Sequence, residues 1–126
     1  MSKIMIIDDD PRVRDVYQST LSALGFDVTA EPDGEKALEN IRINKVKPDL
    51  ILLDMMMPKI FGMDILDIIK ATPEASAIKI IVLSALSDKE TIEKAKQFGA
   101  ADFITKSETT MPEVVERIKK VLEGNP

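Results

Sequence analysis

The fold of this chain is constrained most by a strict alternation between short apolar runs and longer segments with helical spacing. The apolar runs occupy residues 4–7, 26–30, 50–53, 78–83 and 103–105. Most of them are continuous rather than interrupted by polar residues, which is typical of parallel strands covered on both faces. After each run, apolar residues recur three and four positions apart, as on one face of an amphipathic helix. The pattern predicts five strands and five helices.

The helical segments carry start and stop signals. The first begins at Pro11, with Asp10 as its expected N-cap, and ends at Gly25. The second and third are expected over about 33–44 and 63–71. The fourth and fifth begin with a capping box, in which a hydroxyl residue precedes a glutamate by three positions: Ser87 with Glu90, and Thr110 with Glu113.

Alternation of strand and helix over 126 residues predicts an α/β fold of the doubly wound type, because a closed eight-unit barrel needs roughly 250 residues. The five strands fit a flavodoxin-like parallel sheet of order 2-1-3-4-5, with the five helices on both faces. The sequence contains no linker rich in Gly, Ser or Pro and no recurring repeat. We therefore expect residues 1–126 to form a single domain.

Composition excludes several kinds of chemistry. The sequence contains no Cys and no His, which excludes disulfides, thiolate metal sites and imidazole bases. With 17 basic and 22 acidic residues, the net charge of −5 disfavours direct binding of nucleic acid or anionic lipid. The N-terminus lacks the apolar run of a signal peptide or membrane span, so we expect a cytoplasmic protein without membrane insertion.

Reactive side chains follow four of the predicted strands. Asp8 and Asp9 follow the first apolar run, Asp54 the third, Ser84 the fourth and Lys106 the fifth. In the predicted strand order, ligands bind at the carboxyl ends of the strands beside the switch between strands 1 and 3. Carboxylates there suit Mg²⁺, for which Mn²⁺ can substitute, while lysine adds a positive charge. An aspartate in such a cleft can attack phosphorus and form an aspartyl-phosphate.

The same segments resemble the response-regulator receiver domain of two-component signalling, of the CheY-like type, over essentially the whole chain. The motifs that carry the resemblance are IMIIDDDP, LILLDMMMPKIFG, IIVLSA and GAADFITK. It implies that Asp54 is the phosphoacceptor. It also implies that the metal ion is held by Asp8, Asp9, Asp54 and the backbone carbonyl of Met56.

Further roles follow from the resemblance alone. It implies that Ser84 and Lys106 bind the phosphoryl group and that Phe103 is an aromatic switch residue coupled to Ser84. A sensor histidine kinase or a histidine phosphotransfer protein would be the donor and would supply the histidine that this chain lacks. The signal would leave through the face formed by the fourth helix, fifth strand and fifth helix, toward a downstream protein that the sequence does not identify.

The resemblance makes the expected protein a stand-alone response regulator, either a monomer or a dimer promoted by phosphorylation. It is not expected to be an enzyme beyond accepting and hydrolysing its own phosphoryl group. Four positions depart from the common family pattern, and one of them is Phe61, which stands where an acidic residue is frequent. Ser107 replaces the proline that favours a cis peptide bond after the lysine, and the apolar Met56 and Leu86 predict slow hydrolysis of the phosphoryl group.

Three alternatives stay open on the sequence. The first is an interaction module of the same fold that works without phosphorylation. The second is an aspartate-dependent phosphohydrolase, although Met56 stands where such enzymes commonly have a second acid. The third is a flavodoxin-like electron carrier, against which stand an acidic first loop, the absence of Trp and a single Tyr.

Overall fold

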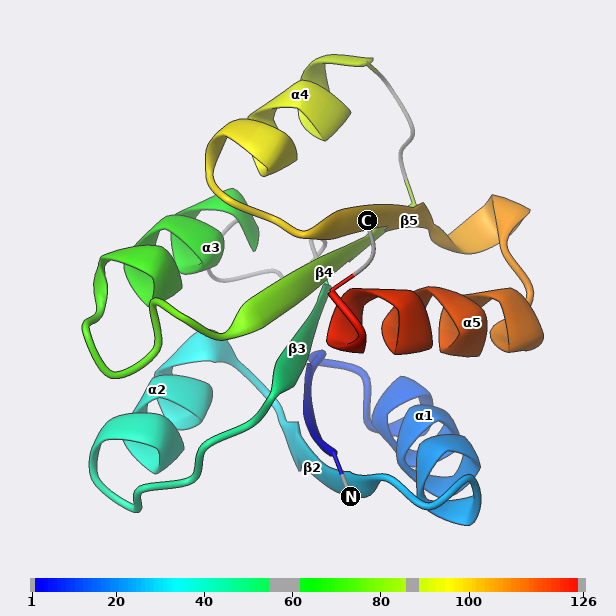
Figure 1. Cartoon of the computed structure of the whole chain (residues 1–126), viewed down its shortest axis with the longest axis horizontal. Coiled ribbons are helices and arrows are strands. Elements are labelled where there is room, and N and C mark those ends of the chain that lie inside the picture. The colour runs from blue at the N-terminus through cyan, green and yellow to red at the C-terminus, as the bar shows by residue number, and fades with distance from the viewer. Residues whose placement is uncertain (1, 55–61, 86–88, 125–126) are drawn as a thin grey trace.

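A computed structural model describes residues 2–54, 62–85 and 89–124 of the chain (Figure 1). Strands and helices alternate along the sequence as predicted, and one short 3-10 helix is added near the C-terminus. The elements are β1 (Lys3–Ile7), α1 (Pro11–Ala23), β2 (Asp27–Glu31), α2 (Gly34–Arg42), β3 (Leu50–Asp54), α3 (Gly62–Ala71), β4 (Lys79–Ser84), α4 (Lys89–Gln97), β5 (Asp102–Thr105), η1 (Lys106–Glu108) and α5 (Met111–Leu122).

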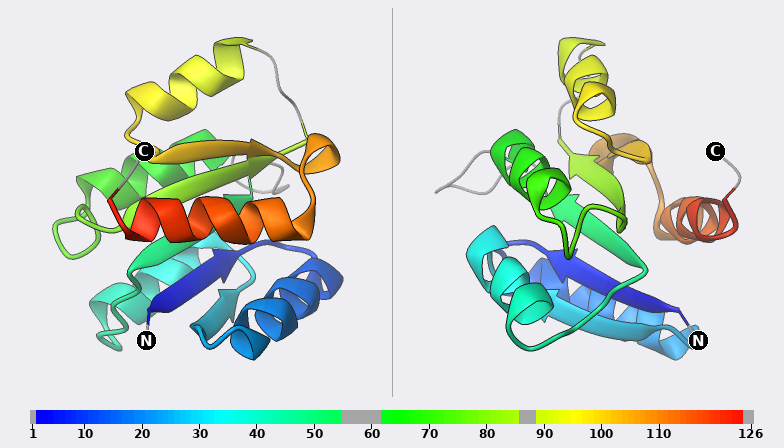
Figure 2. Two further views of the ribbon diagram at one scale, coloured as in Figure 1. Left: turned by 45° about the vertical axis from the view of Figure 1, so that its right-hand side comes forward. Right: turned by 60° about the vertical axis from the view of Figure 1, so that its left-hand side comes forward.

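The five strands form one parallel sheet of order β2-β1-β3-β4-β5. The predicted flavodoxin-like order is therefore confirmed. Helices α1 and α5 cover one face of the sheet, and α2, α3 and α4 cover the other (Figures 1 and 2). Because all strands run in the same direction, their carboxyl ends meet at one edge of the sheet.

The sheet divides the hydrophobic core into two layers. Met5, Leu53 and Val82 pack in the layer beneath α2, α3 and α4. Ile6 and Leu52, which alternate with them along the strands, pack in the layer beneath α1 and α5. Every residue of β3 is buried, which explains why its sequence is a continuous apolar run up to Asp54.

The predicted helix caps explain where the first and last helices begin. Asp10 directly precedes α1, and its carboxylate accepts a hydrogen bond from the backbone N–H of Arg12 at 2.9 Å. The Thr110 hydroxyl accepts one from the N–H of Glu113 at 3.4 Å, as the capping box predicts. The other predicted capping box falls on Ser87, which lies outside the described residues.

Most predicted boundaries differ from the observed ones by one or two residues. Within the described ranges, the sequence pattern missed one element, η1, which immediately follows β5. It is a single turn of three residues, too short to show a hydrophobic period. No peptide bond in the described segments is cis, and this includes the bond between Lys106 and Ser107.

None of the helices in the described ranges 2–54, 62–85 and 89–124 is both long and apolar enough to cross a membrane.

Gly34 is a point of close contact between α2 and α3. A Cβ atom added there would lie 3.0 Å from three side-chain carbons of Ile65, which is itself buried. We expect Gly34→Ala to lower the free energy of unfolding by about 1–3 kcal/mol because a packed side chain must move. Urea denaturation would measure the change, and the exposed Lys36→Ala is a control expected within about 0.5 kcal/mol of wild type.

A double-mutant cycle tests the physical cause. In an Ile65→Ala background the contact is gone, so adding Gly34→Ala should be neutral or stabilising. An equal loss in both backgrounds would show that helix geometry, and not the contact with Ile65, disfavours alanine.

Candidate functional site

The reactive residues predicted at the strand ends are brought to one edge of the sheet. Asp8 and Asp9 directly follow β1, Asp54 ends β3, and Ser84 ends β4. Lys106 begins η1, directly after β5. The register aligns these ends, since Ile7 pairs with Leu53, Asp54 with Leu83, and Ser84 with Thr105.

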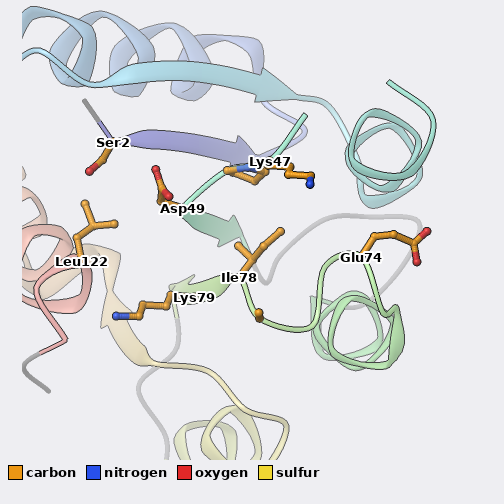
Figure 3. A pocket seen from close by; sticks show the side chains of 9 residues that line it. Ser2, Lys47, Asp49, Glu74, Ile78, Lys79 and Leu122 are labelled. Carbon is orange, nitrogen blue, oxygen red and sulfur yellow. The ribbon is translucent and has the colours of Figure 1, made fainter. Parts of the chain in front are cut away.

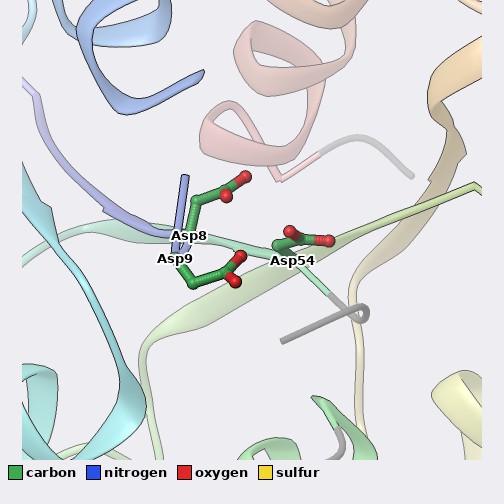
Figure 4. Close-up of side chains that lie close together, drawn as sticks. All are labelled: Asp8, Asp9 and Asp54. Carbon is green, nitrogen blue, oxygen red and sulfur yellow. The ribbon is translucent and has the colours of Figure 1, made fainter. Parts of the chain in front are cut away.

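Three carboxylates form a cluster beside the switch point. One carboxylate oxygen from each of Asp8, Asp9 and Asp54 lies within 4.8 Å of the others (Figure 4). Asp8 and Asp54 are buried, with 1% and 4% of their surface exposed, whereas Asp9 is exposed. The cluster is therefore open to solvent on the side of Asp9 and enclosed on the other two.

Lys106 supplies the positive charge of the site. Its Nζ lies 3.3 Å from Oδ1 of Asp54 and 3.6 Å from Oδ2 of Asp8. Burial acts to lower the pKa of Lys106, but the charges of Asp54 and Asp8 outweigh it, and the pKa is raised. The ammonium group therefore stays charged at neutral pH and offsets part of the repulsion among the acids.

The two carboxylate oxygens of Asp8 differ in their hydrogen bonds. Oδ1 accepts a hydrogen bond from the backbone N–H of Asp10 at 2.9 Å. Oδ2 is buried and has no hydrogen-bond partner among the described residues. Burial raises the pKa of Asp8 and the neighbouring charge of Asp54 adds to the rise, while the hydrogen bond from Asp10 opposes it.

These features fit a hard divalent cation. A buried carboxylate oxygen without a hydrogen bond needs an explanation, and metal coordination provides one. The donor set consists only of oxygen atoms and opens to water through Asp9, which matches the preference of Mg²⁺ for a few carboxylates and several water molecules. The fourth expected ligand, the carbonyl of Met56, lies outside the described residues, as does Leu86.

Ser84 and Phe103 lie on the same side of the sheet. Phe103 pairs with Val82 in the register of β4 and β5, and both side chains belong to the layer beneath α2, α3 and α4. Ser84 is two residues beyond Val82 and therefore faces the same layer. Ser84 is 1% exposed and Phe103 is 9% exposed.

The sequence pattern did not identify two residues of α1 that border the site. Arg14 donates a hydrogen bond from Nη1 to the backbone carbonyl of Asp8 at 2.7 Å. Tyr17 is partly buried and packs against the core beneath α1 and α5. Burial raises the pKa of Tyr17, and Lys106 lies near enough to oppose that rise electrostatically. The only signal was their spacing of three residues, which places both on one helix face.

A cavity lies at the opposite edge of the sheet and is not part of this site. It has a volume of about 500 Å³ and is bordered by Asp49, Glu74 and Lys79 (Figure 3). Three of the four charged groups in its wall have partners within the domain. Asp49 accepts a hydrogen bond from the N–H of Lys3 at 2.8 Å, and Lys79 donates one to the carbonyl of Val121 at 2.8 Å. Glu74 forms an ion pair with Arg42 at 3.3 Å.

Comparison with solved structures identifies the class of fold. The chemotaxis protein CheY4 of Vibrio cholerae superimposes with a TM-score of 0.86, covering 96% of this chain and 98% of that one, at 23% sequence identity. The BeF3-activated N-terminal receiver domain of RstA from Klebsiella pneumoniae gives a TM-score of 0.81, covering 96% of this chain and 98% of that one, at 30% identity. The fold is therefore the CheY-like variant of the flavodoxin-like fold.

Sequence comparison then identifies the family. The family model of the response regulator receiver domain matches residues 4–119. The DNA-binding response regulator MtrA of Mycolicibacterium smegmatis is 32% identical over 123 residues, covering 98% of this chain and 51% of the relative. A probable transcriptional regulator, ycf27 of Galdieria sulphuraria, is 37% identical over 120 residues, covering 95% of this chain and 45% of the relative. This chain belongs to the receiver domain family of two-component response regulators, and it spans about half the length of these curated relatives.

Asp8 tests the electrostatic cost of the cluster. Because its pKa is raised in the folded state, ionisation of Asp8 at neutral pH opposes folding, and this cost disappears below the pKa of the unfolded chain. Asp8→Asn keeps an oxygen that can accept the Asp10 hydrogen bond and removes the charge. In EDTA at pH 7 we expect a higher melting temperature than wild type, by about 4 °C for each ~1 kcal/mol gained.

In the presence of metal, the melting temperature of wild type should exceed that of Asp8→Asn. Ten millimolar Mg²⁺ should raise the melting temperature of wild type and have little effect on Asp8→Asn, because a ligand that binds only the folded state stabilises it. If Asp8→Asn melts at a lower temperature than wild type in EDTA, ionised Asp8 does not oppose folding.

Proposed function

We propose that this chain is a response regulator that accepts a phosphoryl group on Asp54 from a histidine kinase or a histidine phosphotransfer protein, in a reaction that requires Mg²⁺. Family membership and one observation of this chain support the proposal: Asp54 lies in contact with Lys106 and within 4.8 Å of two further acids. Asp54 would be the nucleophile, because it is the acid that directly ends a fully buried strand and is held by it.

The chemistry follows from the charges around Asp54. A carboxylate oxygen of Asp54 attacks phosphorus, and the bond from phosphorus to the donor nitrogen or oxygen breaks. Bound Mg²⁺ would neutralise charge on the phosphoryl oxygens, with Asp8 and Asp9 as its side-chain ligands in addition to Asp54. Lys106 is positioned to pair with the product, because its Nζ already lies 3.3 Å from Asp54 Oδ1.

We further propose that Ser84 and Phe103 transmit the modification to the α4–β5–α5 face. Ser84 ends the strand next to that of Asp54, and it lies on the same side of the sheet as Phe103. Helix α4, which is fully described, buries only Ala95 among its own residues. A helix held by so little buried surface can shift at low cost, which suits a face that changes with phosphorylation.

Output through protein contact fits the charge of the chain better than direct binding of nucleic acid. The relatives named above are DNA-binding or transcriptional regulators, and this chain matches about half of their length. A net charge of −5 disfavours contact with phosphate backbones. We propose that the α4–β5–α5 face contacts another protein surface, whether on a separate partner or on the same polypeptide.

Labelling with a small phosphodonor tests the proposal. Incubation with acetyl phosphate and Mg²⁺, followed by intact-mass analysis, should give one phosphoryl adduct on wild type and none on Asp54→Asn. Asp10→Asn is the matched control, because the Asp10 carboxylate caps α1 and pairs with the exposed Arg12, and the variant keeps the backbone N–H that bonds Asp8. It should be labelled like wild type. EDTA should abolish labelling.

Two outcomes would contradict the proposal. Absence of an adduct with either acetyl phosphate or phosphoramidate would favour the interaction module that works without phosphorylation. Continued release of phosphate far beyond one equivalent per chain from a stable phosphate ester would favour the phosphohydrolase.

A further inference from the structure

We propose that Arg14 is a positioning residue that holds the peptide between Asp8 and Asp9 and thereby sets the affinity of the acid cluster for Mg²⁺. This inference rests on the proposed function of the cluster and adds a residue to it. Arg14 lies on α1 and would not touch the metal ion or the phosphoryl group. Its effect would pass through the backbone of the two acids.

The contact made by Arg14 is well placed for this role. Its Nη1 donates to the carbonyl oxygen of Asp8 at 2.7 Å in a partly buried position. That carbonyl belongs to the peptide that joins Asp8 to Asp9, so its orientation governs the direction in which both carboxylates project. The cation in contact with the Asp8 carboxylate itself is Lys106, at 3.6 Å.

The strand does not hold this peptide by itself. Strand β1 ends at Ile7, and the N–H of Asp8 donates to the carbonyl of Glu31 at 3.1 Å. The Asp8 carbonyl therefore lies beyond the last residue of β1, and Arg14 provides its hydrogen bond. One side of the Asp8 backbone is thus tied to β2 and the other to α1.

The local helix geometry makes the tie short. Only residues 8–10 separate β1 from α1, and the backbone N–H of Arg14 donates to the carbonyl of Asp10 at 3.1 Å. The N–H of Asp10 in turn holds Oδ1 of Asp8 at 2.9 Å. The side chain of Arg14 therefore contacts Asp8 directly, and its backbone contacts Asp10, which in turn bonds Asp8. Residues behind metal ligands commonly change metal affinity by about 10- to 100-fold when removed.

Charge and position predict opposite effects of removing Arg14. A positive charge near the site repels Mg²⁺, so if Arg14 acted only through its charge, its removal would tighten metal binding. If it holds the Asp8–Asp9 peptide, its removal weakens metal binding. The direction in which the Mg²⁺ affinity changes therefore distinguishes an effect of the Arg14 charge from an effect of its hydrogen bond.

Calorimetric titration of the full chain with Mg²⁺ is the test. Arg14→Met keeps most of the aliphatic stem and should raise the Kd for Mg²⁺ about tenfold. Arg14→Lys keeps a donor and the charge, and it should recover part of the loss. Arg12→Met is the matched control, because Arg12 is a neighbouring cation whose side chain is 91% exposed and pairs only with Asp10 among the described residues. Its Kd should stay within about twofold of wild type.

Two further measurements separate positioning from a general loss of structure. In Mg²⁺-free protein, the ¹⁵N shift of the Asp9 amide should move in Arg14→Met and stay unchanged in Arg12→Met, since that nitrogen shares the peptide that Arg14 contacts. At limiting Mg²⁺, labelling of Arg14→Met by acetyl phosphate should be slower than labelling of wild type, and raising the Mg²⁺ concentration should narrow the difference. If Arg14→Met does not fold, Arg14→Lys alone carries the test, with an expected Kd increase of about threefold.

The inference is overturned if the Arg14 variants bind Mg²⁺ as tightly as wild type or more tightly, or if Arg12→Met weakens binding equally. Its failure is distinct from failure of the proposed function. If only the role of Arg14 is wrong, wild type still binds Mg²⁺ and is labelled on Asp54. If the proposed function is wrong, wild type itself shows no labelling.

Discussion

The repulsion among three carboxylates at one end of the sheet is the constraint on which the site depends. Two such charges ~5 Å apart repel by about 3 kcal/mol at an effective dielectric of 20. Two of the acids are almost fully buried, so water screens them poorly. Lys106 lies in contact with both and supplies one positive charge against three carboxylates, and Oδ2 of Asp8, although 3.6 Å from that lysine, has no hydrogen bond among the described residues. The cluster is therefore poised to bind a cation.

Burial of the apolar strands offsets the destabilising repulsion among the three acids. The strands that end at the site are flanked by two apolar layers, and β3 is buried along its whole length up to Asp54. Burial of continuous apolar strands contributes stability in proportion to the area removed from water, at about 25 cal/mol per Å². The same burial fixes the strand ends in register, so the acids cannot move apart to relieve their repulsion.

The sequence predicted the parts of the site that follow from strand ends. Asp8, Asp54 and Lys106 could be placed because parallel strands bring their carboxyl ends to one edge, and the structure confirms that placement. The switch role expected for Phe103 rests on family resemblance alone, since its apolar run looks like any other strand. Arg14 could not be found, because a single arginine in the first turns of a helix has no distinguishing pattern, and its contact with Asp8 is set by how α1 packs against β1.

Strand alternation also directs Asp54 and Ser84 toward opposite faces of the sheet. Asp54 follows Leu52 by two residues and therefore lies toward the layer of α1 and α5, whereas Ser84 follows Val82 and lies toward the layer of α2, α3 and α4. Groups from the two layers meet only at the edge of the sheet, where the strands end. A phosphoryl group on Asp54 would thus have one short route to α4, in which the Ser84 hydroxyl moves toward it across the strand ends. The Ser84 side chain would leave space on the side of Phe103, and that space would couple chemistry on one face of the sheet to a rearrangement on the other.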